Sequence, residues 1–588
     1  MKLWKISLTF LTIALGANLA YAKKEPKYEK AHQLTAEQAA LVEKAIAREK
    51  IVVKNIQQRT PLVETYIQDM RPDDKLYQVP ISDTYMLSRV DFHKTFTDKP
   101  YAARGPAKHG FFKGSASAFA KIGEALHLDK ETYNTDGFTQ MMFLDPVSFD
   151  QQHYVFSYVR REFLGSIRTW EYDVHPKVAG NGRFIGRIWV EDQDGNIVRF
   201  NGTYSEGSGE DNTKEWFHFD SWRMNMQPDL WLPVAVYVEE SQRIEGGKTV
   251  GLRAQTRFWG YSLTLPTRES ENVSVQVEGA VDQSADSQDE TPLQATRAWV
   301  AQAENNVIDR LVQAGLLDPP SDFDKTPLEQ IVTNLAVPNN LNFPDPVHCR
   351  VLLTTTVEAT TIGNTILISK GLIDTLPNEE SFAAVIAFEL AHVALGHHID
   401  TRYAFNDRLL FPDESSFKQI KMNHSDTDNI EAAKKATEYM QASMYKDKIP
   451  NAGLYLAQLA DRGKALKQLN TPKLGDSMLK ADGTPWLGEL AKTAPKLAQD
   501  DTTQIAALPL GSWLKTDPWD DKEHELNAKR YAPLNARDKM PFEVTPINYK
   551  LLRYEDAQKV PAGTMPGQAP APAPAQAAAP TAAPTGTN

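Results

Sequence analysis

One long apolar helix near the middle of the chain constrains the fold more than any other feature. Residues 381–400 read SFAAVIAFELAHVALGHHID and follow an acidic turn at 378–380. Apolar side chains recur along this stretch at helical spacing, at Phe382, Val385, Ile386, Leu390, Val393 and Leu395. A helix about five turns long with so few polar residues is largely buried, so the chain must build a core around it.

Five residues of this helix resemble a metal-binding motif. They are Phe388-Glu389-Leu390-Ala391-His392, and a histidine in place of Phe388 would make them H-E-x-x-H. In that motif two histidines one turn apart bind zinc, and the glutamate polarises a bound water. The first histidine is absent here, so the chemistry of the helix depends on the role of the phenyl ring.

Length and charge limit the class of protein. A chain of 588 residues is too long for one ordinary core, which predicts two folded domains with linkers. A formal net charge of -12 offers no strong phosphate-neutralising surface, so we expect no nucleic-acid partner. Beyond the N-terminal segment, no apolar tract reaches the ~18 residues that cross a bilayer, so we expect no transmembrane segment.

The N-terminus has the pattern of an export signal. Lys2 and Lys5 precede a short apolar stretch at residues 6–17, and Ala20-Tyr21-Ala22 fits the small-x-small rule for cleavage. We therefore expect residues 1–22 to be removed after Ala22 and the protein to be periplasmic or secreted from a bacterium. The single cysteine, Cys349, cannot form an internal disulfide, so stability must come from core size.

The N-terminal half predicts a helix followed by an antiparallel sheet. Residues 23–75 have a charged, helical pattern with Thr35 as an N-cap, so we expect a helical arm. Between residues 76 and 268, apolar and polar residues alternate in segments separated by glycine turns. The predicted strands are 141–144, 152–159, 169–174, 183–191, 196–204, 216–223 and 231–239. Such a meander should curve into a half-barrel.

Residues 163–177, 182–205 and 217–240 resemble lipoprotein-sorting carrier domains of the LolA-like kind in their layout of strands. The resemblance implies a half-open barrel whose concave face holds acyl chains, and therefore a lipid or lipoprotein partner. Several tryptophans either line such a groove or fill the core of a curved sheet. They are Trp170, Trp189, Trp216, Trp222 and Trp231.

The remaining segments divide by composition. Residues 269–292 are polar, acidic and free of aromatic residues, which is typical of a linker. A second domain is predicted over residues 293–545, with further helices at 292–316, 327–335 and 451–469. Residues 546–588 form a Pro/Ala-rich tail, which we expect to be disordered because it cannot bury a core.

The central helix and its surroundings resemble the CAAX prenyl protease/HtpX family of zinc metallopeptidases over roughly residues 327–520. The matching elements are a strand at 366–372, an acidic turn, the central helix ending near residues 396–398, and a later helix at 430–436. The resemblance implies an α+β gluzincin fold, zinc, and endopeptidase action on envelope or secreted polypeptides. It assigns Glu389 as general base and His392 and Glu431 as zinc ligands.

The sequence departs from this family at three positions. Phe388 replaces the first histidine ligand, Ala433 replaces an aspartate that orients the ligands, and Ala436 replaces a glycine. With only His392 and Glu431, zinc has one ligand fewer than a catalytic site uses. We therefore expect weak zinc binding and impaired or absent hydrolysis.

Three other histidines are candidates for the missing ligand. Around a continuous helix, His397 lies about 140° from His392 and His398 about 120° the other way, so neither shares its face. His424 lies in a predicted loop shortly before Glu431, where we expect it to be solvated.

The residues leave three functions open: a peptidase with an unorthodox ligand, a pseudopeptidase that binds polypeptide as a scaffold or chaperone, and a carrier of lipid or lipoprotein. The family lays its substrates along an edge strand, and the resemblance assigns that strand to Thr365, Ile366, Leu367, Ile368 and Ser369. Backbone hydrogen bonds at an edge need no zinc. The alternative is an edge that the protein's own loops cover.

Overall fold

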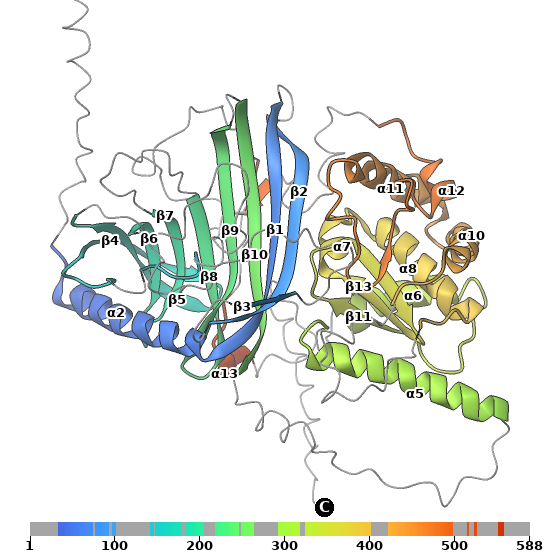
Figure 1. Cartoon of the computed structure of the whole chain (residues 1–588), viewed down its shortest axis with the longest axis horizontal. Coiled ribbons are helices and arrows are strands. Elements are labelled where there is room, and N and C mark those ends of the chain that lie inside the picture. The colour runs from blue at the N-terminus through green and yellow to red at the C-terminus, as the bar shows by residue number, and fades with distance from the viewer. Residues whose placement is uncertain are drawn as a thin grey trace, which may run out of the picture.

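The protein consists of an N-terminal β domain and a C-terminal α+β domain (Figure 1). This computed structural model describes residues 33–73, 77–92, 97–100, 141–145, 148–178, 183–204, 218–245, 248–263, 292–317, 324–400, 422–497, 514–516, 523–525 and 551–557. The predicted signal peptide, most of the predicted linker and Trp216 lie outside these residues. Within them, no helix is long and apolar enough to cross a membrane.

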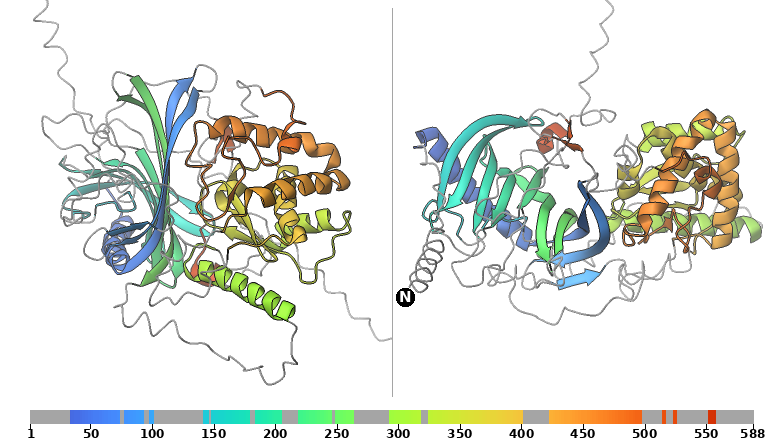
Figure 2. Two further views of the ribbon diagram at one scale, coloured as in Figure 1. Left: turned by 45° about the vertical axis from the view of Figure 1, so that its right-hand side comes forward. Right: turned by 90° about the horizontal axis from the view of Figure 1, so that it is seen from above.

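The β domain is one antiparallel sheet whose two end strands do not meet. The strand order is β3-β2-β1-β10-β9-β8-β7-β6-β5-β4. The strands are β1 (Arg59–Asp73), β2 (Tyr77–Asp91), β3 (Thr97–Pro100), β4 (Tyr154–Leu164), β5 (Ile167–Pro176), β6 (Phe184–Glu191), β7 (Ile197–Tyr204), β8 (His218–Gln227), β9 (Leu230–Glu245) and β10 (Lys248–Leu263). Figure 2 shows the sheet curving, which confirms the predicted half-open antiparallel domain.

Helix α2 (Ala36–Gln57) covers the inner face of this sheet. It begins with a capping box at Thr35 and buries its apolar side against strands β1 and β5 to β10. The prediction of a helical arm is correct for α2 but wrong beyond Gln57, because residues 59–73 form strand β1. Strand β1 is hydrogen-bonded to β2 on one side and β10 on the other. This pairing overrides the local pattern. The strand predicted at 141–144 is a turn.

The tryptophans of the β domain lie on two different faces. Trp170 belongs to the inner apolar cluster under α2. Trp189, Trp222 and Trp231 are buried together on the opposite face of the sheet. These three therefore fill a separate small core and do not line the inner face.

The α+β domain surrounds helix α8 (Glu379–Leu395) with helices and a small sheet. Its other helices are α5 (Pro292–Gln313), η1 (Asp324–Leu328), α6 (Glu329–Ala336), α7 (Lys370–Thr375), α10 (Asp426–Ala442), η2 (Lys446–Lys448), α11 (Ile449–Gly463) and α12 (Gly488–Ala491). Its sheet contains β11 (His348–Leu352), β12 (Glu358–Ile362), β13 (Thr365–Ser369) and β14 (Asp476–Ser477). Further along the chain are β15 (Leu514–Thr516), β16 (Glu523–Glu525) and α13 (Tyr554–Ala557).

The predicted substrate strand is not at an edge. The order in the small sheet is β11-β13-β12-β14, so β13, residues 365–369, is parallel to β11 and antiparallel to β12. Its backbone groups are therefore used on both sides. The prediction that Thr365 to Ser369 offer a free edge to a polypeptide is wrong, because two neighbouring strands of the same domain already pair with them.

The two domains meet through buried carboxylates of the β domain. Glu64 on β1 accepts hydrogen bonds from the backbone N–H of Thr355 at 2.5 Å, from the hydroxyl of Thr355 at 2.6 Å and from Tyr85 at 2.8 Å, and it pairs with Arg257 at 3.3 Å. Asp83 on β2 accepts from two backbone N–H groups of residues 468–469. Around these bonds, apolar side chains of both domains share two buried clusters. The junction is therefore packed like a core.

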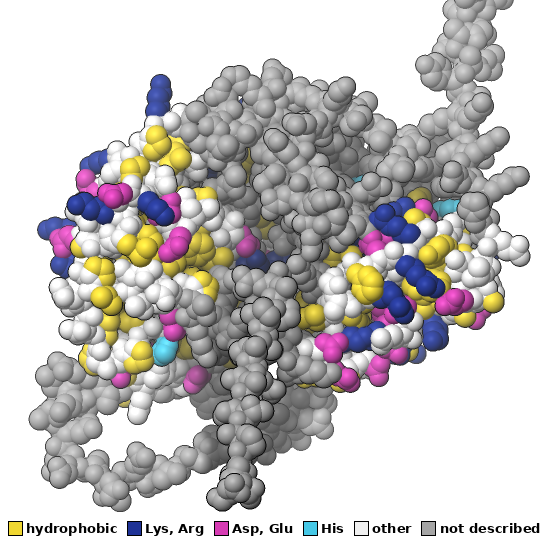
Figure 3. Space-filling view, turned by 180° about the vertical axis from the view of Figure 1, so that it is seen from behind, with side chains coloured by type: hydrophobic (Ala, Val, Ile, Leu, Met, Phe, Trp, Pro, Cys, Tyr) yellow, Lys and Arg dark blue, Asp and Glu magenta, His cyan; other side chains and the backbone are white. Residues whose placement is uncertain are grey.

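Both charge signs occur together on the surface of the described residues. On the face shown in Figure 3, Lys, Arg, Asp and Glu side chains are interspersed over both domains.

The junction predicts a strong effect of Glu64→Ala. The change leaves four donors without their buried acceptor, so the free energy of unfolding should fall by about 3–5 kcal/mol. Amide hydrogen exchange at Thr355 should accelerate as well, because its N–H loses the carboxylate that accepts from it. Denaturant unfolding and exchange mass spectrometry measure the two effects.

Glu43→Ala is the matched control, because Glu43 is exposed on α2. It should leave both measurements nearly unchanged. If amide hydrogen exchange at Thr355 stays at the wild-type rate in Glu64→Ala, the contact between Glu64 and Thr355 is contradicted.

Candidate functional site

Helix α8 ends earlier than its sequence pattern suggests. Asn378 caps its first turn by accepting from the N–H of Ser381, and Gly396 ends it in a left-handed conformation at φ 68° and ψ 35°. Glycine adopts that conformation at little cost, which makes it a common helix terminator. The chain therefore turns after Leu395, and angles around a continuous helix do not describe the positions of His397 and His398.

Phe388 occupies the first position of the motif as a core residue. Its side chain is buried with Ala384, Ala387 and Ala391 in the main apolar cluster of the α+β domain. The ring packs edge-on against that of His392, with centroids 5.1 Å apart. An apolar ring that offers no lone pair therefore stands where the motif requires a metal ligand.

Three histidines come together beside α8. His392 is fully buried, and its Nδ1 lies 3.0 Å from Nδ1 of His397. The ring of His424 stacks on the ring of His392, with centroids 3.9 Å apart and planes tilted by 31°. His424 is buried, and Asp476 accepts from its backbone N–H at 3.0 Å and lies 2.7 Å from its Nδ1. The prediction that His424 is solvated is therefore wrong, and so is the prediction that His397 points away from His392.

His398 does not join this cluster. Its Nδ1 lies 2.8 Å from Glu304 of α5, and that contact raises the pKa of His398. Glu304 also packs against Gly363, the turn between β12 and β13. His398 therefore ties α5 to the small sheet.

The centre of the site favours uncharged forms of its acid and base. Glu389 is fully buried, and one of its oxygens accepts from the hydroxyl of Thr361 at 2.8 Å. Burial and the neighbouring Asp476 raise the pKa of Glu389 well above its usual range. Burial, with His424 and His397 nearby, lowers the pKa of His392 to about 2. Without a compensating ion, a dry environment thus keeps the carboxyl protonated and the imidazole neutral.

Glu431 lies at the rim of the cluster. It is on α10, six residues after the capping residue Ser425, and 60% of its side chain is exposed. Its carboxylate is 3.8 Å from Nε2 of His397. The alanines that replace the family's aspartate and glycine, Ala433 and Ala436, are buried in the core beside α8. Glu431 therefore approaches the histidines through His397.

The family's zinc set does not fit these residues. Phe388 supplies no donor, and the His424 ring stacks directly on that of His392. In the described part of the chain, no group of three or more His, Cys, Asp or Glu side chains has the arrangement to hold a metal. Four buried polar atoms at this place nevertheless have no hydrogen-bond partner among the described residues. They are Oε1 of Glu389, Nε2 of His392, Nε2 of His424 and Oδ1 of Asn429.

A comparison with protein-family models relates part of the C-terminal domain to a known family. Residues 323–443, which include α8, α10 and all three histidines of the cluster, match the model of peptidase family M48. We call the C-terminal domain, which contains this matched segment, the M48 domain. The match confirms the resemblance to zinc metallopeptidases that the sequence indicated. A comparison with curated protein sequences found no match.

Two solved structures resemble the chain over 40% of its length. One is a LolA superfamily protein of Nitrosomonas europaea, 12% identical, with 97% of its chain covered and a TM-score of 0.21. The other is a putative outer membrane lipoprotein-sorting protein domain of Vibrio parahaemolyticus, 9% identical, with 98% covered and a TM-score of 0.22.

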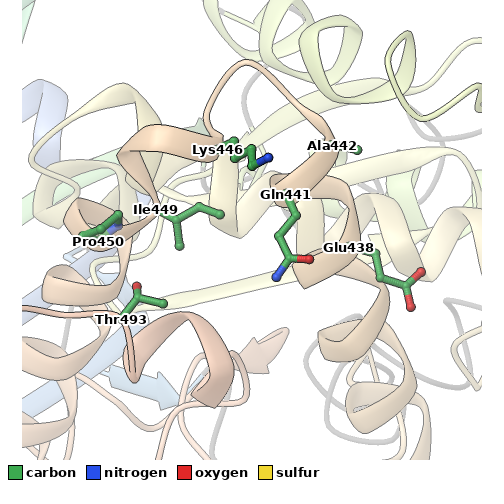
Figure 4. Close-up of a pocket in the computed structure, with 7 residues that line it drawn as sticks. All are labelled: Glu438, Gln441, Ala442, Lys446, Ile449, Pro450 and Thr493. Atoms are coloured by element: carbon green, nitrogen blue, oxygen red, sulfur yellow. The ribbon is translucent and has the colours of Figure 1, made fainter.

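A pocket of about 650 Å³ lies elsewhere in the M48 domain (Figure 4). It is formed by the C-terminal end of α10, by η2, by the start of α11 and by Thr493, with a mainly apolar lining. His424 and Asn429 lie at the other end of α10, so this pocket is separate from the histidine cluster. Its lining residues are Glu438, Gln441, Ala442, Lys446, Ile449, Pro450 and Thr493.

The raised pKa of Glu389 predicts a pH-dependent effect of Glu389→Gln. A raised pKa means that the native state holds a proton that the unfolded chain releases near pH 4.5. Stability from this group is complete below that pH and is lost as the pH rises through the native pKa. Glutamine keeps the neutral form, so the variant should gain stability over wild type as the pH rises from 5 to 8, by up to ~1.4 kcal/mol per pH unit.

Urea unfolding of both proteins across this range measures the difference. Glu431→Gln is the control, because its exposed carboxylate should produce no such trend. A constant difference between Glu389→Gln and wild type from pH 5 to pH 8 would show that Glu389 is ionised in the native state.

Proposed function

We propose that the protein is an exported polypeptide-binding member of the M48 peptidase family in which zinc-dependent hydrolysis has been lost. One observation carries this proposal: the buried ring of Phe388 stands at the first ligand position and packs against His392. Without that ligand, the glutamate has no metal-bound water to activate. Substrates of a peptidase family are polypeptides, so binding of polypeptide is the property that we expect the domain to retain, as a scaffold or chaperone.

The surroundings of α8 support a binding role outside the family's cleft. Strand β12 lies beside α8 and pairs with β14, and the hydroxyl of Thr360 donates to the carbonyl of Met422. Strand β13 is enclosed by its neighbours. Segments of the same chain thus occupy the positions that an extended substrate would take beside the motif, which is the alternative of a covered edge.

Phe388→His tests the loss of the zinc ligand directly. The new histidine would lie one turn from His392, whose Nε2 has no partner among the described residues. We expect the variant to bind stoichiometric zinc and the wild type to bind none. Neither protein should cleave casein, because segments of the same chain occupy the positions of an extended substrate beside the motif. Metal analysis and casein digestion measure the two properties.

Two controls separate this gain from a general effect of an added histidine. Phe382→His places the same residue on α8 away from His392, and Phe388→His with His392→Ala removes the partner ligand. Both should lack zinc and activity. Chelator-sensitive cleavage of casein by the wild-type protein would overturn the proposal.

Lipid or lipoprotein carriage by the β domain is a second candidate. The observation that favours it is the large apolar inner face of the sheet, which among the described residues is covered by helix α2 and by apolar side chains of residues 141–149. An amphipathic helix over an apolar concave face can be displaced by an acyl chain of similar apolar area.

This second function predicts that acyl species accompany the purified protein. Mass spectrometry of an organic extract should find fatty acyl chains or lipoprotein in stoichiometric amount. Ala45→Asp, on the buried side of α2, should weaken the packing of α2 on the sheet and change the amount of acyl species that the protein retains. Lys44→Asp, on the exposed side of α2, should change neither. An extract without acyl chains would remove this candidate.

A further inference from the structure

A short segment near the C-terminus returns to the β domain. Residues 551–557 were predicted to belong to a disordered tail, but this prediction is wrong for them. Leu551 is fully buried on the face of the sheet opposite α2, and α13 follows it there (Figure 2). Its apolar neighbours are Leu164, Ile167, Trp189, Val198, Trp222 and Trp231. Sequence composition could not reveal this contact, because the receiving residues lie more than three hundred positions away.

The segment is held through its backbone as well as through Leu551. The carbonyl of Leu551 accepts from the N–H of Ser166 at 2.9 Å and from its hydroxyl at 3.3 Å. The N–H of Tyr554 donates to Oδ1 of Asn225 at 2.7 Å. Backbone bonds of this kind fix the direction and register of a bound chain without depending on its side chains.

A charge contact supplies the second anchor. The guanidinium of Arg553 donates to Glu191 at 2.6 Å and to Asp194 at 3.3 Å. The other donors to Glu191 come from the turn that follows it, namely the N–H groups of Gln193, Asp194 and Asn196 and the Asn196 amide. Although burial opposes it, these hydrogen bonds lower the pKa of Glu191. The carboxylate is thus held in place by the β domain and presented to a cation.

The walls around Leu551 are also rigid without the segment. The guanidinium of Arg199 lies between the rings of Trp189 and Trp222, 4.2 Å and 4.8 Å from their centroids, and pairs with Asp220 at 2.8 Å. Trp222 donates to the same aspartate at 3.0 Å. An apolar cluster whose side chains contact one another, a backbone donor and a carboxylate held by its own turn together have the composition of a ligand site.

We propose that this face of the β domain is a peptide-recognition site for segments with an aliphatic residue two positions before an arginine, and that residues 551–554, Leu-Leu-Arg-Tyr, are its resident ligand. This deepens the proposed polypeptide binding, on which it rests, by naming a site and a peptide class. It is independent of zinc.

The test removes the resident segment from the site by substitution in the full-length chain, and then adds the same segment as a separate peptide. Leu551→Asp with Arg553→Glu removes both anchors of the resident ligand. A fluorescent peptide of residues 546–560 should bind this variant saturably and at least ~10-fold more tightly than wild type, whose site is occupied. Glu555→Ala is the matched control chain, because Glu555 is exposed, and it should bind the peptide as weakly as wild type does.

Peptide variants then identify the two anchors. Peptides with Leu551→Asp or Arg553→Gln should each lose at least ~10-fold in affinity for the emptied chain, and a peptide with Glu555→Ala should lose none. Adding Glu191→Gln to the emptied chain should abolish the preference for Arg553 over its glutamine variant while dependence on Leu551 persists. This last result also shows that the site is still folded.

Two outcomes overturn the inference. One is no saturable binding of the peptide to the emptied chain, and the other is equal binding of the wild-type and Leu551→Asp peptides. Neither outcome bears on zinc content or casein cleavage, so failure here is distinguishable from failure of the proposed loss of hydrolysis.

Discussion

The contact between the rings of Phe388 and His392 determines the chemistry of the M48 domain. An apolar ring at a ligand position removes one donor and also keeps the surroundings dry. In such surroundings a charge without a partner is costly, so Glu389 retains its proton and His392 remains neutral. The site thus keeps the glutamate and histidine of the peptidase motif. The glutamate holds the proton that a general base would have to accept, whereas the neutral histidine is in the form that binds metal.

Buried carboxylates hold the distant segments of this chain together. Glu64 of the β domain accepts from Thr355 of the M48 domain, and Glu191 accepts from its own turn and from Arg553 near the C-terminus. Glu358 of β12 accepts three backbone N–H groups, from Lys473, Leu474 and Gly475, at 2.7–3.0 Å. A carboxylate with several N–H donors is well compensated for the loss of water. Each such carboxylate therefore fixes a backbone segment where no regular secondary structure does.

Local patterns in the sequence predicted the elements that local forces determine. Strands β4 to β9 and helices α2, α5, α8 and α11 follow from periodicity and capping residues. What local patterns missed depends on distant contacts or on a single backbone angle. Strand β1 is fixed by pairing on both sides, and the position of His397 depends on the turn at Gly396. Stacking of His424 on His392 requires Asp476, which lies far along the chain.

Segments of the same chain occupy the places where each domain would receive a polypeptide, but they are held differently. Strand β14 pairs beside β12, next to the three N–H groups that Glu358 fixes, so its displacement would break several buried bonds together. Residues 551–557 are held by one buried leucine, one arginine and hydrogen bonds at two of their backbone groups. A competing peptide needs to replace only those few contacts. Exchange of a bound segment is therefore easier on the β domain than beside the former zinc position, and binding of polypeptide can persist there after the cleft of the M48 domain has closed.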